Sequence, residues 1–121
     1  MNKFRDDARR LESEAKRFRD QKHFGESLRL YKFAAQTWER TGNKEEQREA
    51  IKKSREVLDQ MGKDAPAFSI ECSLLGAQLL KIGETKLARK YYNLAMETDP
   101  VPRQKEKYRK IIEDIDAKSK L

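Results

Sequence analysis

The chain has 121 residues, with 28 Lys or Arg against 21 Asp or Glu, a net charge of +7 and a single cysteine. One cysteine excludes an intrachain disulfide framework, the charged amino terminus argues against a secretory signal, and no apolar run approaches the roughly 20 residues of a membrane-spanning helix. We therefore expect a cytoplasmic protein. Because 40% of the residues are charged and only 36% are hydrophobic, only narrow apolar stripes can form. This favours one all-α domain, built as a thin two-layer stack of helices.

Helical periodicity begins near the amino terminus, and neither strand alternation nor a hairpin turn interrupts it. A first helix is predicted over about residues 3–22 and a second over about 24–41, with Gly25 in the short turn between them. Their apolar stripes consist of Phe4, Ala8, Leu11, Ala15 and Phe18 in the first helix, and of Phe24, Leu28, Tyr31, Ala35 and Trp38 in the second.

Three glycines then mark helix ends. Gly42, Gly62 and Gly83 each stand where a left-handed residue would terminate a helix. They bound a third helix over about residues 44–61, which is the most polar of the set, and a fourth helix with Pro66 in its first turn.

The fourth helix extends to Ile82 and is apolar on several sides. A helix of this kind needs cover on several sides, so we expect it to be the central rod of the domain. One face carries Phe68, Cys72, Leu75, Leu79 and Ile82, and Ile70, Leu74, Ala77 and Leu80 lie outside that face.

A fifth helix over about residues 84–98 and a sixth over about 103–118 complete the chain, separated by the proline-rich segment 99–102. Short connections predict that consecutive helices are antiparallel neighbours, grouped as hairpins over about 3–41, 44–82 and 84–118. The inward residues of the last two helices are Leu87, Ala88, Tyr91, Tyr92, Leu94 and Ala95, followed by Tyr108, Ile111, Ile112 and Ile115.

One spacing of large and small residues occurs twice. Counted from Ser69, it places Cys72, Leu75, Gly76, Leu79, Ala88, Tyr92, Ala95 and Pro100. Counted from Ala8, the same places hold Leu11, Glu14, Ala15, Phe18, Ser27, Tyr31, Ala34 and Glu39, with the two glutamates where Leu and Pro belong. This pattern resembles the tetratricopeptide repeat (TPR), and the resemblance implies a short right-handed TPR-like solenoid of about six helices.

The two registers start 61 residues apart, not the roughly 68 that two 34-residue repeats occupy. The middle of the chain therefore holds an odd helix or a repeat of irregular length. The segment 41–46 resembles the longer turns of soluble-NSF-attachment-protein-like scaffolds, and the first helices are similar to the small MIT module of trafficking ATPases.

The sequence contains no catalytic constellation, and we expect neither enzyme activity, nor a cofactor, nor a metal site. His23, the only histidine, is expected to be a surface or capping residue. Cys72 lies on an apolar stripe, where a free cysteine behaves as a small hydrophobic residue. The five glycines form no phosphate-binding loop.

Stacked helical hairpins form a concave groove, so we expect an adaptor that binds a peptide or helix of a partner protein. Apolar groove residues would contact the partner while basic ones attract its acidic groups. In the alternative arrangement, the sixth helix folds back over this surface as a cap. The TPR resemblance implies groove positions at Arg9, Glu12, Lys16, Arg19 and Asp20 in the first repeat, and at Ile70, Ser73, Ala77, Leu80 and Lys81 in the last. Glu12 and Ser73 replace the lysine with which some TPR proteins clamp a carboxylate, which argues against that class of partner.

Nucleic-acid binding is the alternative function, because basic residues cluster twice. Acidic residues are interleaved in both clusters, and this dilution of positive charge favours a solvated helix face and a protein partner. The clusters are Arg9, Arg10, Lys16, Arg17 and Arg19, and then Arg103, Lys105, Lys107, Arg109 and Lys110 beside Tyr108.

Overall fold

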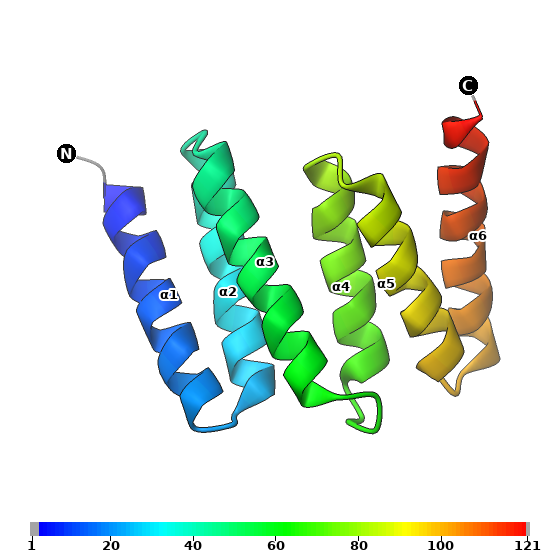
Figure 1. Cartoon of the computed structure of the whole chain (residues 1–121), viewed down its shortest axis with the longest axis horizontal. Coiled ribbons are helices and arrows are strands. Elements are labelled where there is room, and N and C mark those ends of the chain that lie inside the picture. Colours follow the sequence, from blue (N-terminus) through cyan, green and yellow to red (C-terminus); the bar gives the residue numbers. More distant parts are fainter. Residues whose placement is uncertain (1–2, 121) are drawn as a thin grey trace. The chain divides into compact units, whose positions relative to one another are not determined.

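The computed structural model describes residues 3–120, which form six α-helices and no strand (Figure 1). This confirms the all-α prediction. The helices are α1 (Lys3–Asp20), α2 (Phe24–Arg40), α3 (Lys44–Met61), α4 (Phe68–Lys81), α5 (Thr85–Thr98) and α6 (Pro102–Ser119). Contacts divide the chain into two units, Met1–Met61 and Gly62–Leu121, each with three helices. The TPR-like solenoid and the pairing of residues 44–82 as one hairpin stay predictions.

The glycines predicted to end helices do so. Gly42, Gly62 and Gly83 have φ angles of 74°, 84° and 80°, in the left-handed region that glycine adopts at little cost. At two of these turns, the amide of the residue after the glycine donates to a carbonyl in the last turn of the helix. The amide of Asn43 donates to the carbonyl of Trp38, and the amide of Glu84 donates to the carbonyl of Leu79. These bonds satisfy carbonyls that would otherwise have no partner.

Two predicted boundaries were wrong. Gly25 lies inside the first turn of α2 and not in the connection, because the helix already begins at Phe24. Pro66 lies two residues before α4, in a turn in which the amide of Phe68 donates to the carbonyl of Ala65 at 3.0 Å. The proline therefore lies within the connection and not in the helix.

In the first unit, α2 packs against both α1 and α3. Small residues bring α1 and α2 together, since Ala8 and Ala15 are fully buried and the hydroxyl of Ser27 donates to the carbonyl of Ala15 at 2.8 Å. Phe4, predicted to belong to the stripe of α1, is 49% exposed. The remaining core residues are Leu28, Tyr31, Ala34, Ala35 and Trp38 of α2, and Ala50, Ile51, Val57 and Leu58 of α3.

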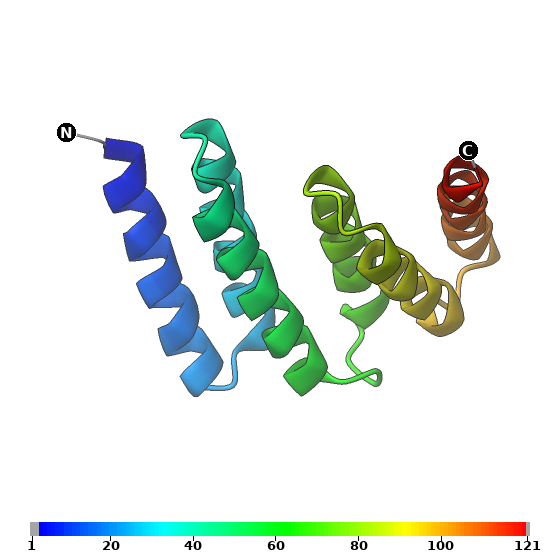
Figure 2. The same ribbon diagram turned by 45° about the horizontal axis from the view of Figure 1, so that its top comes forward.

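In the second unit, α5 packs against both α4 and α6, and Figures 1 and 2 show it beside each of them. Within this unit, α5 and not α4 therefore takes the central position. The apolar residues of α4 outside its buried face are accessible: Ile70 is 55% exposed, and Leu74 and Leu80 are each 37% exposed. Ile70 and Leu80 are predicted groove positions, whereas Leu74 is not, so Leu74 is the residue that departs from the expected cover. The core consists of Phe68, Cys72, Leu75 and Leu79 of α4, Ala88, Tyr91, Tyr92 and Ala95 of α5, and Tyr108, Ile112 and Ile115 of α6.

Candidate functional site

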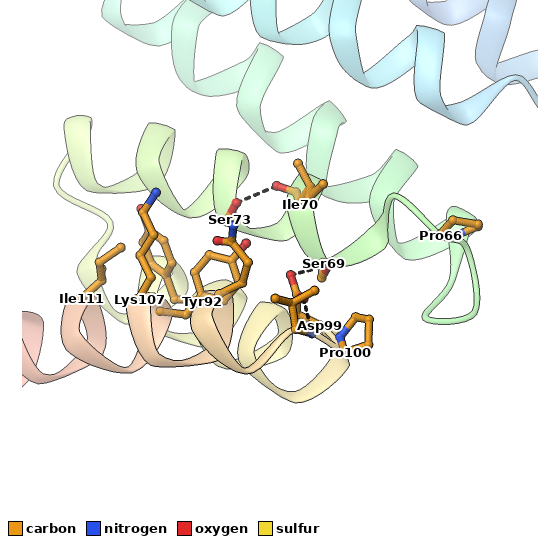
Figure 3. Close-up of a pocket in the computed structure, with 12 residues that line it drawn as sticks. Pro66, Ser69, Ile70, Ser73, Tyr92, Asp99, Pro100, Lys107 and Ile111 are labelled. Atoms are coloured by element: carbon orange, nitrogen blue, oxygen red, sulfur yellow. Dashed lines mark hydrogen bonds between the residues drawn. The ribbon is translucent and has the colours of Figure 1, made fainter.

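Two neighbouring hollows lie between α4 and α6 in the second unit, and they share Ile111. The first has a volume of about 610 Å³ and is drawn in Figure 3. It is lined by Pro66, Ser69, Ile70, Ser73, Tyr92, Asp99, Pro100, Val101, Gln104, Lys107, Tyr108 and Ile111. The second, of about 640 Å³, is lined by Leu80, Thr85, Lys86, Ile111, Asp114, Ile115, Lys118 and Ser119. We call the two together the α4–α6 groove.

The order of the lining residues fixes the direction of the two walls. The first hollow takes Ile70 from the start of α4 and Gln104 from the start of α6. The second takes Leu80 from the end of α4 and Lys118 from the end of α6. The two walls therefore run in the same direction, and the groove follows their length.

Apolar side chains are accessible along this groove. Ile70 and Leu80 on α4 and Val101 before α6 are exposed, and Ile111 on α6 is partly exposed. The buried stripe of each wall already packs on α5, so these side chains are additional to the core. Exposed apolar residues gathered along one groove are typical of a surface that binds another molecule.

Tyr92 and Tyr108 form the floor of the first hollow. Their ring centroids are 6.5 Å apart with the planes tilted by 42°, and each residue is 5% exposed. Burial, and to a smaller degree the neighbouring Tyr108, raises the pKa of Tyr92. The floor therefore consists of two buried aromatic rings that lie against each other.

Hydrogen bonds of buried Asp99 secure the connection between α5 and α6. Its carboxylate accepts from the hydroxyl of Ser69 at 3.2 Å and from the amide of Val101 at 2.9 Å. Figure 3 shows Ser69 turned toward Asp99, and Ser73 toward the carbonyl of Ile70. The bonds of Asp99 tie the start of α6 to α4 and so position the two walls.

The charges that line the groove are mostly positive. Lys107 lies in the first hollow, and Lys86 and Lys118 lie in the second. Among the described residues that line the second hollow, Asp114 is the acidic one, and the carboxylate of Asp99 in the first already accepts two hydrogen bonds. The groove therefore offers more cationic than anionic groups to a bound molecule.

Of the predicted binding residues on α4, the groove includes Ile70, Ser73 and Leu80. Ala77 and Lys81 are exposed residues of the same helix but do not line either hollow.

The predicted binding residues on α1 belong to the first unit. Arg9 and Glu12 line a hollow of about 280 Å³ together with residues of α3. Both side chains contact Trp38: the guanidinium of Arg9 lies 5.0 Å from its ring centroid, and Glu12 accepts from its indole nitrogen at 3.3 Å. Arg19 pairs with the neighbouring Asp20 at 3.6 Å, and Lys16 is exposed.

The α6 wall was missed as a binding surface because the sequence analysis considered α6 only as an alternative cap for the groove. α6 packs on α5 and leaves Ile70 and Leu80 exposed, so it forms the second wall and does not cover the first. A signal for this wall existed in the TPR period of 34 residues. Adding one period to the groove positions Ile70, Ser73, Ala77, Leu80 and Lys81 gives Gln104, Lys107, Ile111, Asp114 and Ile115, all of which line the groove.

The residues considered for chemistry occupy structural positions. His23 is exposed, stands at the N-cap of α2 and stacks on Phe18 with ring centroids 6.1 Å apart. Cys72 is buried. Both placements were predicted. Among residues 3–120, no group of three or more His, Cys, Asp or Glu side chains could hold a metal ion. Within the same residues, no helix combines the length and apolarity needed to cross a membrane.

The carboxy-terminal basic cluster is partly occupied by the protein's own groups. Arg109 forms ion pairs with Glu106 and Glu113, and Tyr108 is buried against Tyr92. Tyr108 is therefore not placed to stack on a nucleic-acid base.

Comparison with known proteins gives no match for the chain among protein-family models, curated proteins or solved structures.

Proposed function

We propose that the chain is a TPR-like helical scaffold whose second unit binds a segment of a partner protein in the α4–α6 groove. The observation that carries the proposal is the exposure of Ile70 and Leu80, 55% and 37%, along a groove whose α4 wall buries its main apolar stripe of Phe68, Cys72, Leu75 and Leu79. Burial of such side chains by a partner is a favourable contribution to binding.

Burial at equivalent positions supports the repeat. The close-contact positions of the two registers hold Ala15 and Gly76, and the large side chains that follow are Tyr31 and Tyr92. All four residues are buried, each within its own unit. Equivalent small and large residues are therefore buried in both units, as a repeated packing arrangement requires.

A selection for binding peptides tests the proposal. Displayed random peptides are selected on the immobilised full-length protein, and their affinities are then measured by fluorescence anisotropy. Leu80→Asp should weaken the selected peptides by about thirtyfold or more, which is the effect of losing a hot-spot contact.

Leu74→Asp is the matched control. Leu74 has the same side chain, the same helix and the same 37% exposure as Leu80, but it does not line the groove. It should leave affinity unchanged, and circular dichroism should show both variants folded. Equal weakening by the two variants, or no selected peptide at all, would contradict the proposal.

A further inference from the structure

We propose that the occupant of the α4–α6 groove is an amphipathic α-helix with acidic side chains beside its apolar stripe, and not an extended segment. This inference rests on the function proposed above and specifies the chemistry of the partner. It follows from the hydrogen bonds, the length and the charges of the groove.

An extended segment would bring its backbone amides and carbonyls into the groove, and buried backbone groups need hydrogen-bond partners. The walls are helices, whose backbone groups are largely paired internally. The segment would therefore depend on side chains that line the groove.

The serine hydroxyls of the groove already donate to the protein itself. Ser73 donates to the carbonyl of Ile70 at 2.7 Å, and Ser119 donates to the carbonyl of Ile115 at 2.9 Å. Ser69 donates to Asp99. Among the described lining residues, the other polar side chains include the amide of Gln104, the hydroxyl of Thr85, the carboxylate of Asp114 and the ammonium groups of Lys86, Lys107 and Lys118. A helix needs none of these side chains for its backbone groups, because they bond within the helix.

The apolar residues of the groove extend over a length that suits a helix. Ile70 and Leu80 are ten residues apart on α4, which corresponds to about 15 Å along the helix axis. A bound helix with apolar residues at positions i, i+4, i+7 and i+11 covers roughly 16 Å. Such a stripe would contact Ile70 and Val101 in the first hollow, Ile111 between the two hollows, and Leu80 in the second.

The lysines of the groove define the charge of that helix. Lys107 lies at one end, and Lys86 and Lys118 lie at the other. These three lysines outnumber Asp114. They therefore favour acidic residues on the partner near both ends of its apolar stripe.

Selection from two peptide libraries on the full-length protein tests the inference. One library presents a stable helix of about 20 residues, randomised along one face and its borders. The other has the same length, with a proline at every fourth position so that it cannot form a helix. Clones from each are then measured against the wild type, Leu80→Asp and Leu74→Asp.

The helix library should give clones that Leu80→Asp weakens and Leu74→Asp does not, with an apolar stripe bordered by Asp or Glu. If only the proline library gives such clones, the helical inference is overturned and the groove function stands. If neither library gives clones weakened by Leu80→Asp, both the helical inference and the proposed function are contradicted.

A charge reversal tests the acidic character separately. Lys107→Glu combined with Lys118→Glu should weaken the selected helices by about tenfold at low salt. Lys110→Glu is the control, because Lys110 is exposed on α6 but does not line the groove. Equal effects of the double variant and the control, or helices selected without acidic residues, would overturn this part of the inference.

Discussion

Gly76 of α4 packs directly on the ring of Tyr92 of α5. A Cβ atom at position 76 would lie 2.8 Å from Cε2 and 2.9 Å from Cδ2 of that ring, well inside the separation at which two carbon atoms pack. The ring is in turn tilted against Tyr108 of α6. The missing side chain at Gly76 therefore sets how closely α4 approaches α5 and where the floor of the groove lies.

Gly76→Ala should destabilise the second unit by about 1–3 kcal/mol, the usual effect of overpacking a core. The loss should appear although alanine favours a helix by about 1 kcal/mol over glycine, because the ring that must move is packed against Tyr108. Urea denaturation followed by circular dichroism measures the change.

Gly25→Ala provides the control, since Gly25 also lies in a helix but a Cβ there meets nothing within 4 Å. It should be neutral or slightly stabilising. In addition, Tyr92→Leu should reduce the cost of Gly76→Ala, because the two residues are in contact. If Gly76→Ala is as stable as the wild type, the close packing described here is not a constraint on the fold.

The helix contacts could be predicted because they depend on local periodicity. A small residue at Gly76 and a large one at Tyr92 recur at spacings that only a helix pair places together, and both are buried. Helix ends were predicted well where glycine was required, as at Gly42. They were predicted poorly at Gly25 and Pro66, which are compatible with both a turn and the first turn of a helix.

The groove could be predicted only in part. Periodicity identifies a buried stripe, but an apolar residue outside the stripe, such as Ile70 or Leu80, fits equally well in a second packed face or on an open surface. The tertiary arrangement decides between these, and α6 packs on α5 beside them. For the same reason Ile111 was assigned to a core stripe, although it lines both hollows.

Loss of α6 should unfold much of the second unit. Ending the chain after Val101 removes buried Tyr108, Ile112 and Ile115 and uncovers the ring of Tyr92. Burial of one such side chain contributes about 1.5–3 kcal/mol, so the combined loss is comparable to the stability of a small domain. Thermal unfolding and amide hydrogen exchange would measure the change.

The point variant Ile112→Ala provides a milder form of this test, with an expected loss of about 2–5 kcal/mol. Protection of α4 and α5 amides should fall, while the α2 amides of the first unit serve as the internal reference. Unchanged protection of α5 in the truncated chain would show that α6 contributes nothing to the core.

Ser27→Ala should cost about 0.5–1.5 kcal/mol, the net contribution of one hydrogen bond. The Ser27 hydroxyl is fully buried and joins α2 to the carbonyl of Ala15 on α1. Thr37→Ala is the control, because its hydroxyl bonds within its own helix, to Phe33 at 2.8 Å. That change should stay within about 0.5 kcal/mol in chemical denaturation. Equal effects would mean that the bond between the two helices adds no stability.

Alkaline pH should destabilise the protein through Tyr31 and Tyr92. Burial is the main cause that raises the pKa of each phenol, and nearby Arg19 partly opposes the shift of the Tyr31 pKa. A raised pKa in the folded state means that the neutral phenol is favoured by folding. This contribution to the free energy of unfolding is complete below the pKa of an unfolded tyrosine, about 10, and is lost as pH rises through the folded-state value.

Urea denaturation at several pH values from about 8 to 11, together with phenolate absorbance, measures this loss. Because lysines titrate in the same range, the informative quantity is the difference between the wild type and the Tyr31→Phe, Tyr92→Phe double variant. The wild type should lose more free energy of unfolding above about pH 10 than the double variant. Equal pH slopes for the two proteins, with both phenols ionising at the ordinary pKa, would show that these side chains are solvated in the folded protein.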